Sequence, residues 1–288
     1  MNIITDTNIW YDIANGDLKV ADIKQNNQNL IYATPINILE IVSNVSDYQF
    51  ERRQRAMIAL IQNADVILQD TETHLTHLWG YNQNSDLISW RDILIAVEHA
   101  NSLYELRNGV LDYSERVTRR VGVDFAHFWR TSHWADFRVA IENVLDQHIS
   151  GYADARQNGR IIHFDQEHGQ EFRNMLYRDV TLHEILNATY DRANLVLRDF
   201  GTSLPAELRD TATLNPIRQN AYNSLSTYIT AYAEYLYTCA TTYAPRDNDW
   251  GDLEHFIYLQ NDNRLLTNDI RWINIARGSG NENWLFHI

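Results

Sequence analysis

The chain has 288 residues, of which 38 are Asp or Glu and 24 are Lys or Arg, so its formal net charge is −14. Apolar residues make up 44% and charged residues 22% of the sequence, which is typical of a globular protein with a buried core and excludes a disordered or collagen-like chain. The acidity argues against a protein that holds nucleic acid through bulk positive charge.

The best candidate for a membrane span, residues 228–244, contains Glu234 and several Thr and Tyr, so the sequence predicts no spanning helix and no membrane partner. The opening MNIITDTNIW lacks the basic and then apolar arrangement of a secretory signal. The single cysteine, Cys239, cannot form an internal disulfide. We therefore expect a cytoplasmic protein.

The first seventy residues have the pattern of alternating strands and helices. Apolar runs predict strands at residues 2–5, 30–33 and 66–68, and helical spacing predicts helices at 7–14, from Pro35 onward, and at 52–62. Thr34 can cap the second helix, and Pro35 fits its first turn. Strands that alternate with helices favour a parallel sheet.

The pattern changes between about residues 71 and 240, where stretches of helical periodicity follow one another. The expected helices are 87–106, 125–148, 167–200 and 215–242. After Pro245 the first pattern resumes, with a helix at 252–259, a strand at 264–267, a helix at 269–276 and a final WLFHI compatible with one more strand. The sequence thus predicts a discontinuous α/β domain, residues 1–70 and 241–288, interrupted by an all-helical domain, residues 71–240.

Four acidic residues are expected near the carboxyl ends of the strands, where parallel α/β folds place their binding sites. Asp6 follows the first strand, Glu40 lies on the second helix, Asp252 opens a late helix, and Asp269 follows the strand at 264–267. Crowded carboxylates repel one another unless a cation neutralises them, and oxygen ligands favour Mg²⁺ or Mn²⁺. Such ions polarise a phosphodiester and activate water for in-line attack. The simpler interpretation, that Asp6 and Asp252 cap helices and Asp269 supports a turn, stays open on spacing alone.

Three segments of the chain resemble the PIN-domain nucleases: DTNIW at 6–10, TPINILEI at 34–41 and GDLEHFIYLQNDNRLLTND at 251–269. In that family an Asp closes the first strand, a Glu lies on the second helix, and a third Asp opens a helix before a strand that ends in Thr-x-Asp. Here Asp269 follows Asp252 by 17 residues, which fits the family pattern. The resemblance implies a PIN-like three-layer α/β domain with a large helical insertion.

The resemblance also implies a metal-dependent endonuclease, in the first place an endoribonuclease, with RNA as substrate. Asp6, Glu40, Asp252 and Asp269 would then be the catalytic acids that bind Mg²⁺ or Mn²⁺. The supporting residues implied are Asn8 beside Asp6, the hydroxyl of Thr267, and Asp249 as a helper ligand or helix N-cap, with Asp247 close by in the sequence. Toxin–antitoxin ribonucleases of this kind have a protein partner that blocks the site.

Two groups of arginines are candidates for phosphate contacts in a single-stranded RNA. They are Arg52, Arg53 and Arg55 on the third helix, and Arg116, Arg119 and Arg120 before the aromatic stretch 125–134. Acidic neighbours favour solvated helix faces instead. Two other functions stay open: an inactive PIN-like scaffold that binds protein, and a nuclease for structured DNA.

Overall fold

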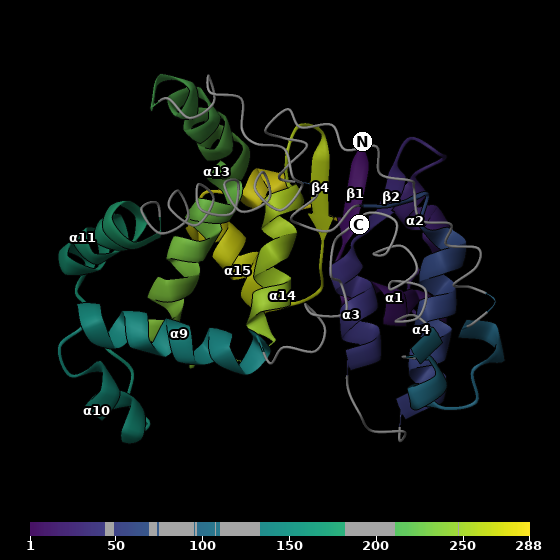
Figure 1. The fold of residues 1–288 in the computed structure, drawn as a ribbon, viewed down its shortest axis with the longest axis horizontal. Coiled ribbons are helices and arrows are strands. Elements are labelled where there is room, and N and C mark those ends of the chain that lie inside the picture. The colour runs from purple at the N-terminus through teal and green to yellow at the C-terminus, as the bar shows by residue number, and fades with distance from the viewer. Residues whose placement is uncertain are drawn as a thin grey trace.

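The computed structural model describes residues 1–43, 49–68, 74, 95, 97–106, 108–109, 133–181, 211–246 and 248–288. A sheet of four parallel strands lies at its centre, in the order β3-β2-β1-β4. The strands are β1 (Asn2–Thr5), β2 (Leu30–Ala33), β3 (Val66–Ile67) and β4 (Asn263–Leu266). β1 therefore lies between β2 and a strand from the far end of the chain (Figure 1). This confirms the predicted α/β class and the pairing of the first and last parts of the chain in one sheet.

Side chains of β1 alternate between two hydrophobic cores, one on each face of the sheet. Ile3 is paired in register with Ile31 of β2, and both belong to one core. Ile4 is paired with Leu265 of β4, and both belong to the other core. Because both faces are covered, the strands are short apolar runs, as is usual in parallel sheets.

The core on the Ile3 face is built mainly by helices from the first part of the chain. These helices are α1 (Thr7–Asn15), α2 (Val20–Lys24), α3 (Pro35–Ser43) and α4 (Phe50–Asn63). Val97, Ala100, Leu103 and Leu106 from the middle of the chain, and Leu266 and Phe286 from its end, also belong to this core. Trp10 of α1, Ile23 of α2 and Met57 of α4 are fully buried in this core. α1 ends at Gly16, whose left-handed conformation (φ 82°) lets its N–H bond to the carbonyls of the last turn.

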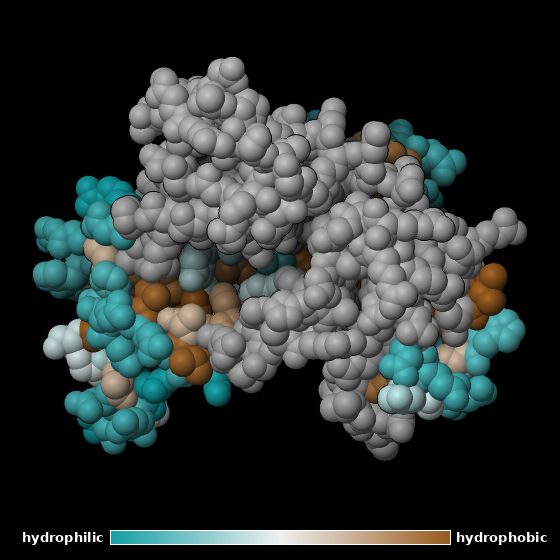
Figure 2. Space-filling model, viewed as in Figure 1, coloured by the Kyte–Doolittle hydropathy of each residue, from teal (hydrophilic) through white to brown (hydrophobic). Residues whose placement is uncertain are grey.

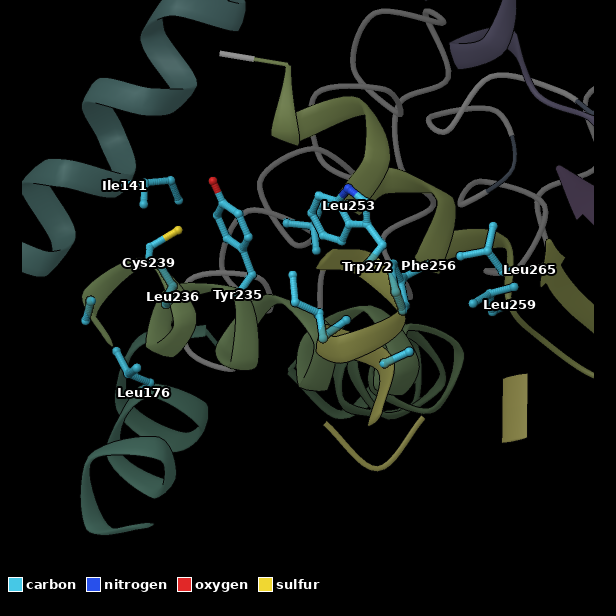
Figure 3. Packing of buried hydrophobic residues seen from close by; sticks show 14 of the residues in the cluster. Ile141, Leu176, Tyr235, Leu236, Cys239, Leu253, Phe256, Leu259, Leu265 and Trp272 are labelled. Atoms are coloured by element: carbon cyan, nitrogen blue, oxygen red, sulfur yellow. The ribbon is translucent and has the colours of Figure 1, made fainter. Parts of the chain in front are cut away.

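Helices from the middle and the end of the chain build the core on the Ile4 face. They are α9 (His133–His148), α10 (Tyr152–Gln157), α11 (Gln166–Met175), the π-helical turn η2 (Leu176–Thr181), α13 (Thr211–Thr241), α14 (Asp249–Glu254), the 3₁₀ turn η4 (His255–Tyr258) and α15 (Ile270–Gly278). Figure 3 shows Tyr235 and Leu236 of α13 in one cluster with Leu253, Trp272 and Leu265. The helices of the middle of the chain therefore share a core with the sheet.

Several predicted elements differ from the structure. The final WLFHI is not a strand, because the 3₁₀ turn η5 (Glu282–Trp284) precedes a single parallel bridge between Leu285 and Leu265. The helix expected at 252–259 begins earlier, at Asp249, and ends in η4. Of the helix expected at 87–106, the structure describes residue 95 and residues 97–106, which are helical at 97–99 and at 103–106. In the helix expected at 125–148, the described part is α9, and residues 125–132 lie outside the described residues. The helix expected at 167–200 is α11 followed by η2, and its part after Thr181 lies outside the described residues. The short helices α2 and α10 were not predicted.

In the part of the chain that the structure describes, no helix has both the length and the apolar character that crossing a bilayer requires. Figure 2 shows that the outer surface of α10 and α11, at the left end of the view, is mostly hydrophilic. Hydrophobic residues, in brown, are visible at the surface where α9 contacts α13 (Figure 2).

Candidate metal centre

Asp6, Glu40 and Asp252 come together beside the carboxyl ends of the strands. Each offers one carboxylate oxygen, and the three oxygens all lie within 4.8 Å of one another. Asp6 follows β1, Glu40 lies on the helix after β2, and Asp252 lies on the helix before β4. Since β1 has β2 on one side and β4 on the other, the group lies where the strand order reverses, which is the usual place for a ligand in an open parallel sheet.

Asp6 occupies the N-cap position of α1, but its side chain makes no capping hydrogen bond. Its Oδ2 accepts hydrogen bonds from Thr267 Oγ1 (2.7 Å) and, more weakly, from Asn8 Nδ2 (3.5 Å). Its Oδ1 is buried and has no hydrogen-bond partner among the described residues. A buried carboxylate oxygen without a donor is costly, and a bound cation could satisfy it.

Glu40 faces Asp6 from α3, and the Thr7 hydroxyl donates a hydrogen bond to its Oε2. Desolvation by the surrounding protein, and then the charge of Asp6, raise the pKa of Glu40 from an ordinary 4.5 to about 8, against the effect of the Thr7 hydrogen bond. A Cβ added at Gly251 of α14 would lie 3.0 Å from Glu40 Oε1. The absence of a side chain at Gly251 therefore lets α14 approach Glu40 closely.

Asp252 completes the group, with its side chain 11% exposed. Desolvation raises its pKa well above the ordinary value, and the charges of Glu40 and Asp6 raise it further, while Arg271 opposes the shift. Three carboxylates in this arrangement need either bound protons or a cation. Their oxygens are hard ligands of the kind that Mg²⁺ and Mn²⁺ prefer.

Asp269, the fourth acid expected in the site, does not belong to this group. Its side chain caps α15 by accepting a hydrogen bond from the backbone N–H of Arg271 (2.8 Å). Its own N–H donates to Thr267 Oγ1 (3.1 Å), the hydroxyl that in turn donates to Asp6. Asp269 is thus connected to the site through Thr267, and its carboxylate supports a helix start, which is the simpler interpretation that the sequence left open.

Asp249, expected as a helper ligand or N-cap, has a different role. The N-cap of α14 is Asn248, and Asp249 is fully buried at the first helical position. Its carboxylate accepts hydrogen bonds from Tyr235 Oη (2.9 Å) and the Arg246 N–H (2.9 Å), and it forms an ion pair with Arg271 (2.5 Å). Asp249 therefore holds Arg271 beside the site, and Asp247 lies outside the described residues.

Two buried polar residues next to the site, Asn37 and His255, were not predicted from the sequence. Asn37 Nδ2 donates to the Thr5 carbonyl (3.0 Å) and to Thr7 Oγ1 (3.2 Å), and it lies 3.2 Å from His255 Nε2. His255 Nδ1 lies 3.0 Å from the Gly251 carbonyl, and burial lowers the pKa of His255. A neutral imidazole that donates from Nδ1 and accepts at Nε2 satisfies both contacts. The sequence signal that could have identified Asn37 and His255 is that each is a polar residue at a helix position where the pattern calls for an apolar one.

The arginines expected to contact nucleic acid divide into three cases. Arg53 is buried, and its Nη1 donates to the carbonyls of Ile41 (2.5 Å) and Glu40 (3.3 Å), so it fixes the end of α3 and the prediction for this residue is wrong. Arg52 and Arg55 are exposed, with the Arg52 guanidinium 4.7 Å from the centre of the Tyr11 ring. Arg116, Arg119 and Arg120 lie outside the described residues.

No protein-family model, curated protein or solved structure matches this chain. The three carboxylates and their surroundings are therefore the basis for a functional conclusion.

Proposed function

We propose that this chain is a Mg²⁺- or Mn²⁺-dependent endonuclease that hydrolyses phosphodiester bonds in RNA. It would consist of a PIN-like domain, residues 1–70 and 241–288, and a helical insertion, residues 71–240. The observation that carries the proposal is the convergence of Asp6, Glu40 and Asp252, whose oxygens lie within 4.8 Å of one another. These three acids come from the three segments that resemble the PIN-domain motifs.

The residues present fit a divalent cation. The donor set is three carboxylates, and one oxygen of Asp6 is buried without a hydrogen-bond partner among the described residues. Burial, and then the charge of neighbouring carboxylates, raises the pKa values of Glu40 and Asp252. A cation bound there would supply charge that polarises a phosphodiester and activates water. Strongly perturbed carboxylates in one cluster are typical of functional sites, whereas an inactive scaffold would gain no stability from their repulsion.

The chain's own residues hold the acids in place for this chemistry. Thr267 and Asn8 fix the orientation of Asp6, and Thr7 fixes that of Glu40. Asn37 ties Thr7 to the end of β1. Because Thr267, Asn8 and Thr7 donate hydrogen bonds to the carboxylates, they favour the negative charge that a cation needs.

Cleavage of labelled substrates tests the proposal, with single-stranded RNA, single-stranded DNA and flap DNA each incubated with Mn²⁺, Mg²⁺ or EDTA. We expect cleavage of RNA that requires the metal and is lost in EDTA. Asp6→Asn keeps the shape of the side chain but removes its charge. Mutation of a residue that hydrogen-bonds to a metal ligand typically lowers activity by 10–100-fold. Asp6 would be a ligand itself, so we expect Asp6→Asn to lower cleavage by about 100-fold or more.

Asp22→Asn is the matched control, because Asp22 is an exposed acid on α2. Equal cleavage by folded Asp6→Asn and wild type would contradict the proposed site. Metal-dependent cleavage of DNA but not of RNA would support the proposed metal site and would show that the substrate is DNA. Absence of any cleavage and of any metal binding would favour the scaffold.

A further inference from the structure

Arg271, in the first turn of α15, brings a permanent positive charge to the edge of the acidic group. Its side chain is 9% exposed, and its Nη1 lies 2.5 Å from Asp249 Oδ1. Its Nη2 lies 3.4 Å from Asp252 Oδ2 and 3.9 Å from Asp269 Oδ2. A cation is unfavourable at a helix N-terminus, so these three carboxylates account for its position.

The surroundings of Arg271 fix its guanidinium at this place. Asp249, its shortest ion-pair partner, is itself held by Tyr235 and by the Arg246 N–H. The guanidinium carbon also lies 5.1 Å from the centre of the Trp272 ring and 5.4 Å from that of Tyr243, within the range of cation–π attraction. A guanidinium does not lose its proton in proteins, so its charge is present at every relevant pH.

Asp252 belongs to the group of three and lies, like Asp269, beside the Arg271 guanidinium. In nucleases that use two metal ions, the ions lie about 3.5–4 Å apart and share acidic ligands. An ion held between Asp252 and Asp269 would occupy the region of Arg271 Nη2, which is within 3.9 Å of an oxygen of each. The guanidinium places its positive charge beside these two carboxylates and would repel a second cation.

We propose that Arg271 takes the place of a second metal ion, so that the site binds a single divalent cation through Asp6, Glu40 and Asp252. This inference rests on the proposed metal site. It adds the number of ions bound, which is one, and names Arg271 as the residue that limits that number. One consequence is that metal activation depends on the first power of the metal concentration. The other is that removal of the Arg271 charge opens a second position between Asp252 and Asp269.

Counting bound Mn²⁺ tests the inference, by calorimetric titration of the full chain and by electron paramagnetic resonance of free Mn²⁺ at about pH 8. We expect one Mn²⁺ per chain in wild type and in Arg271→Lys, which keeps the charge, and two in Arg271→Gln. Arg277→Gln is the matched control and should bind one, because Arg277 lies on the same helix in an exposed ion pair with Glu282 (2.8 Å).

Two Mn²⁺ ions in wild type would overturn the inference and leave the proposed function intact. One ion in folded Arg271→Gln would also overturn it. No bound Mn²⁺ in wild type would overturn the metal site itself, and the inference with it. The wild-type count needs no variant, so the test remains decisive if Arg271→Gln does not fold.

Discussion

Glu40 and Asp252 hold protons more tightly in the folded chain than in water, because the surrounding protein removes hydration and neighbouring carboxylates repel the charge. For Glu40 the pKa rises to about 8. A proton and a cation compete for the same oxygens, so metal affinity should weaken as the pH falls below that value.

The same shift predicts how the stability of the metal-free chain depends on pH. Between the ordinary pKa of 4.5 and about 8, folded Glu40 keeps a proton that the unfolded chain has released. The folded state then binds more protons, so the free energy of unfolding should fall as the pH rises through this window. Urea unfolding in EDTA at several pH values measures the change.

Glu40→Gln is the control for this prediction, because it cannot ionise but has a similar shape. We expect a flatter pH profile for this variant than for wild type over the same window. Identical profiles for the two proteins would show that Glu40 does not have a raised pKa.

At the residue scale, the sequence predicted the three acids that meet but also a fourth, Asp269, which does not belong to the group. Asp6, Glu40 and Asp252 follow from their places beside the strands. The burial of Asp249 depends on Tyr235 and Arg271, which lie on other helices. Contacts of this kind cannot be inferred from local spacing.

At the scale of elements, α3 and α14 meet at Gly251, beside the acidic group. A Cβ there would lie 3.0 Å from Glu40 Oε1 and 3.1 Å from Ile36 Cγ2. Gly251→Ala should therefore displace α14 from α3 and move Asp252 relative to Glu40. We expect a loss of about 10-fold in Mn²⁺ affinity, as for other changes in the support of a metal ligand, measured by calorimetric titration.

Gly169→Ala is the matched control, because it also changes a helical Gly to Ala under similar crowding. Its Cβ would lie 3.0 Å from Tyr237 Oη, in the packing of α11 against α13. It should alter the free energy of unfolding without altering Mn²⁺ affinity. Wild-type affinity in folded Gly251→Ala would show that the approach of α14 to α3 does not set the ligand geometry.

Elements with a strong local pattern were predictable. The strands at 2–5 and 30–33 are short apolar runs with the predicted bounds, and α3 begins at Pro35 as expected. The conformation of the last residues, 284–288, was not predictable. An apolar run indicates that a segment is buried but does not distinguish a strand from a packed turn. There, η5 leaves a single bridge, and Phe286 N–H donates to the Leu265 carbonyl (2.8 Å).

At the scale of the whole molecule, the acidic group joins three segments that are far apart in the sequence. The repeated strand and helix pattern after Pro245 predicted that the chain returns to the sheet, and in the structure β4 pairs with β1. The face that the middle helices cover was not predictable, because helical periodicity reveals an apolar side but not its partner. In the structure, Tyr235 and Leu236 of α13 pack in one core with Trp272 (Figure 3).

Because a cation at Asp6, Glu40 and Asp252 would bind only the folded chain, it should stabilise the whole molecule. At a concentration 100 times its dissociation constant, such a ligand adds about 2.7 kcal/mol, which corresponds to a rise of several degrees in melting temperature for a chain of this size. Without metal, Asp6→Asn should melt at or above the wild-type temperature, since it removes one repelling charge.

Thermal unfolding with and without Mn²⁺, at about pH 8, therefore tests most directly whether the three carboxylates form one cation site. We predict that Mn²⁺ raises the melting temperature of wild type and of the control Asp22→Asn by the same several degrees, and that it leaves Asp6→Asn and Asp252→Asn nearly unchanged. An unchanged melting temperature in wild type, or an equal rise in all four proteins, would contradict the site.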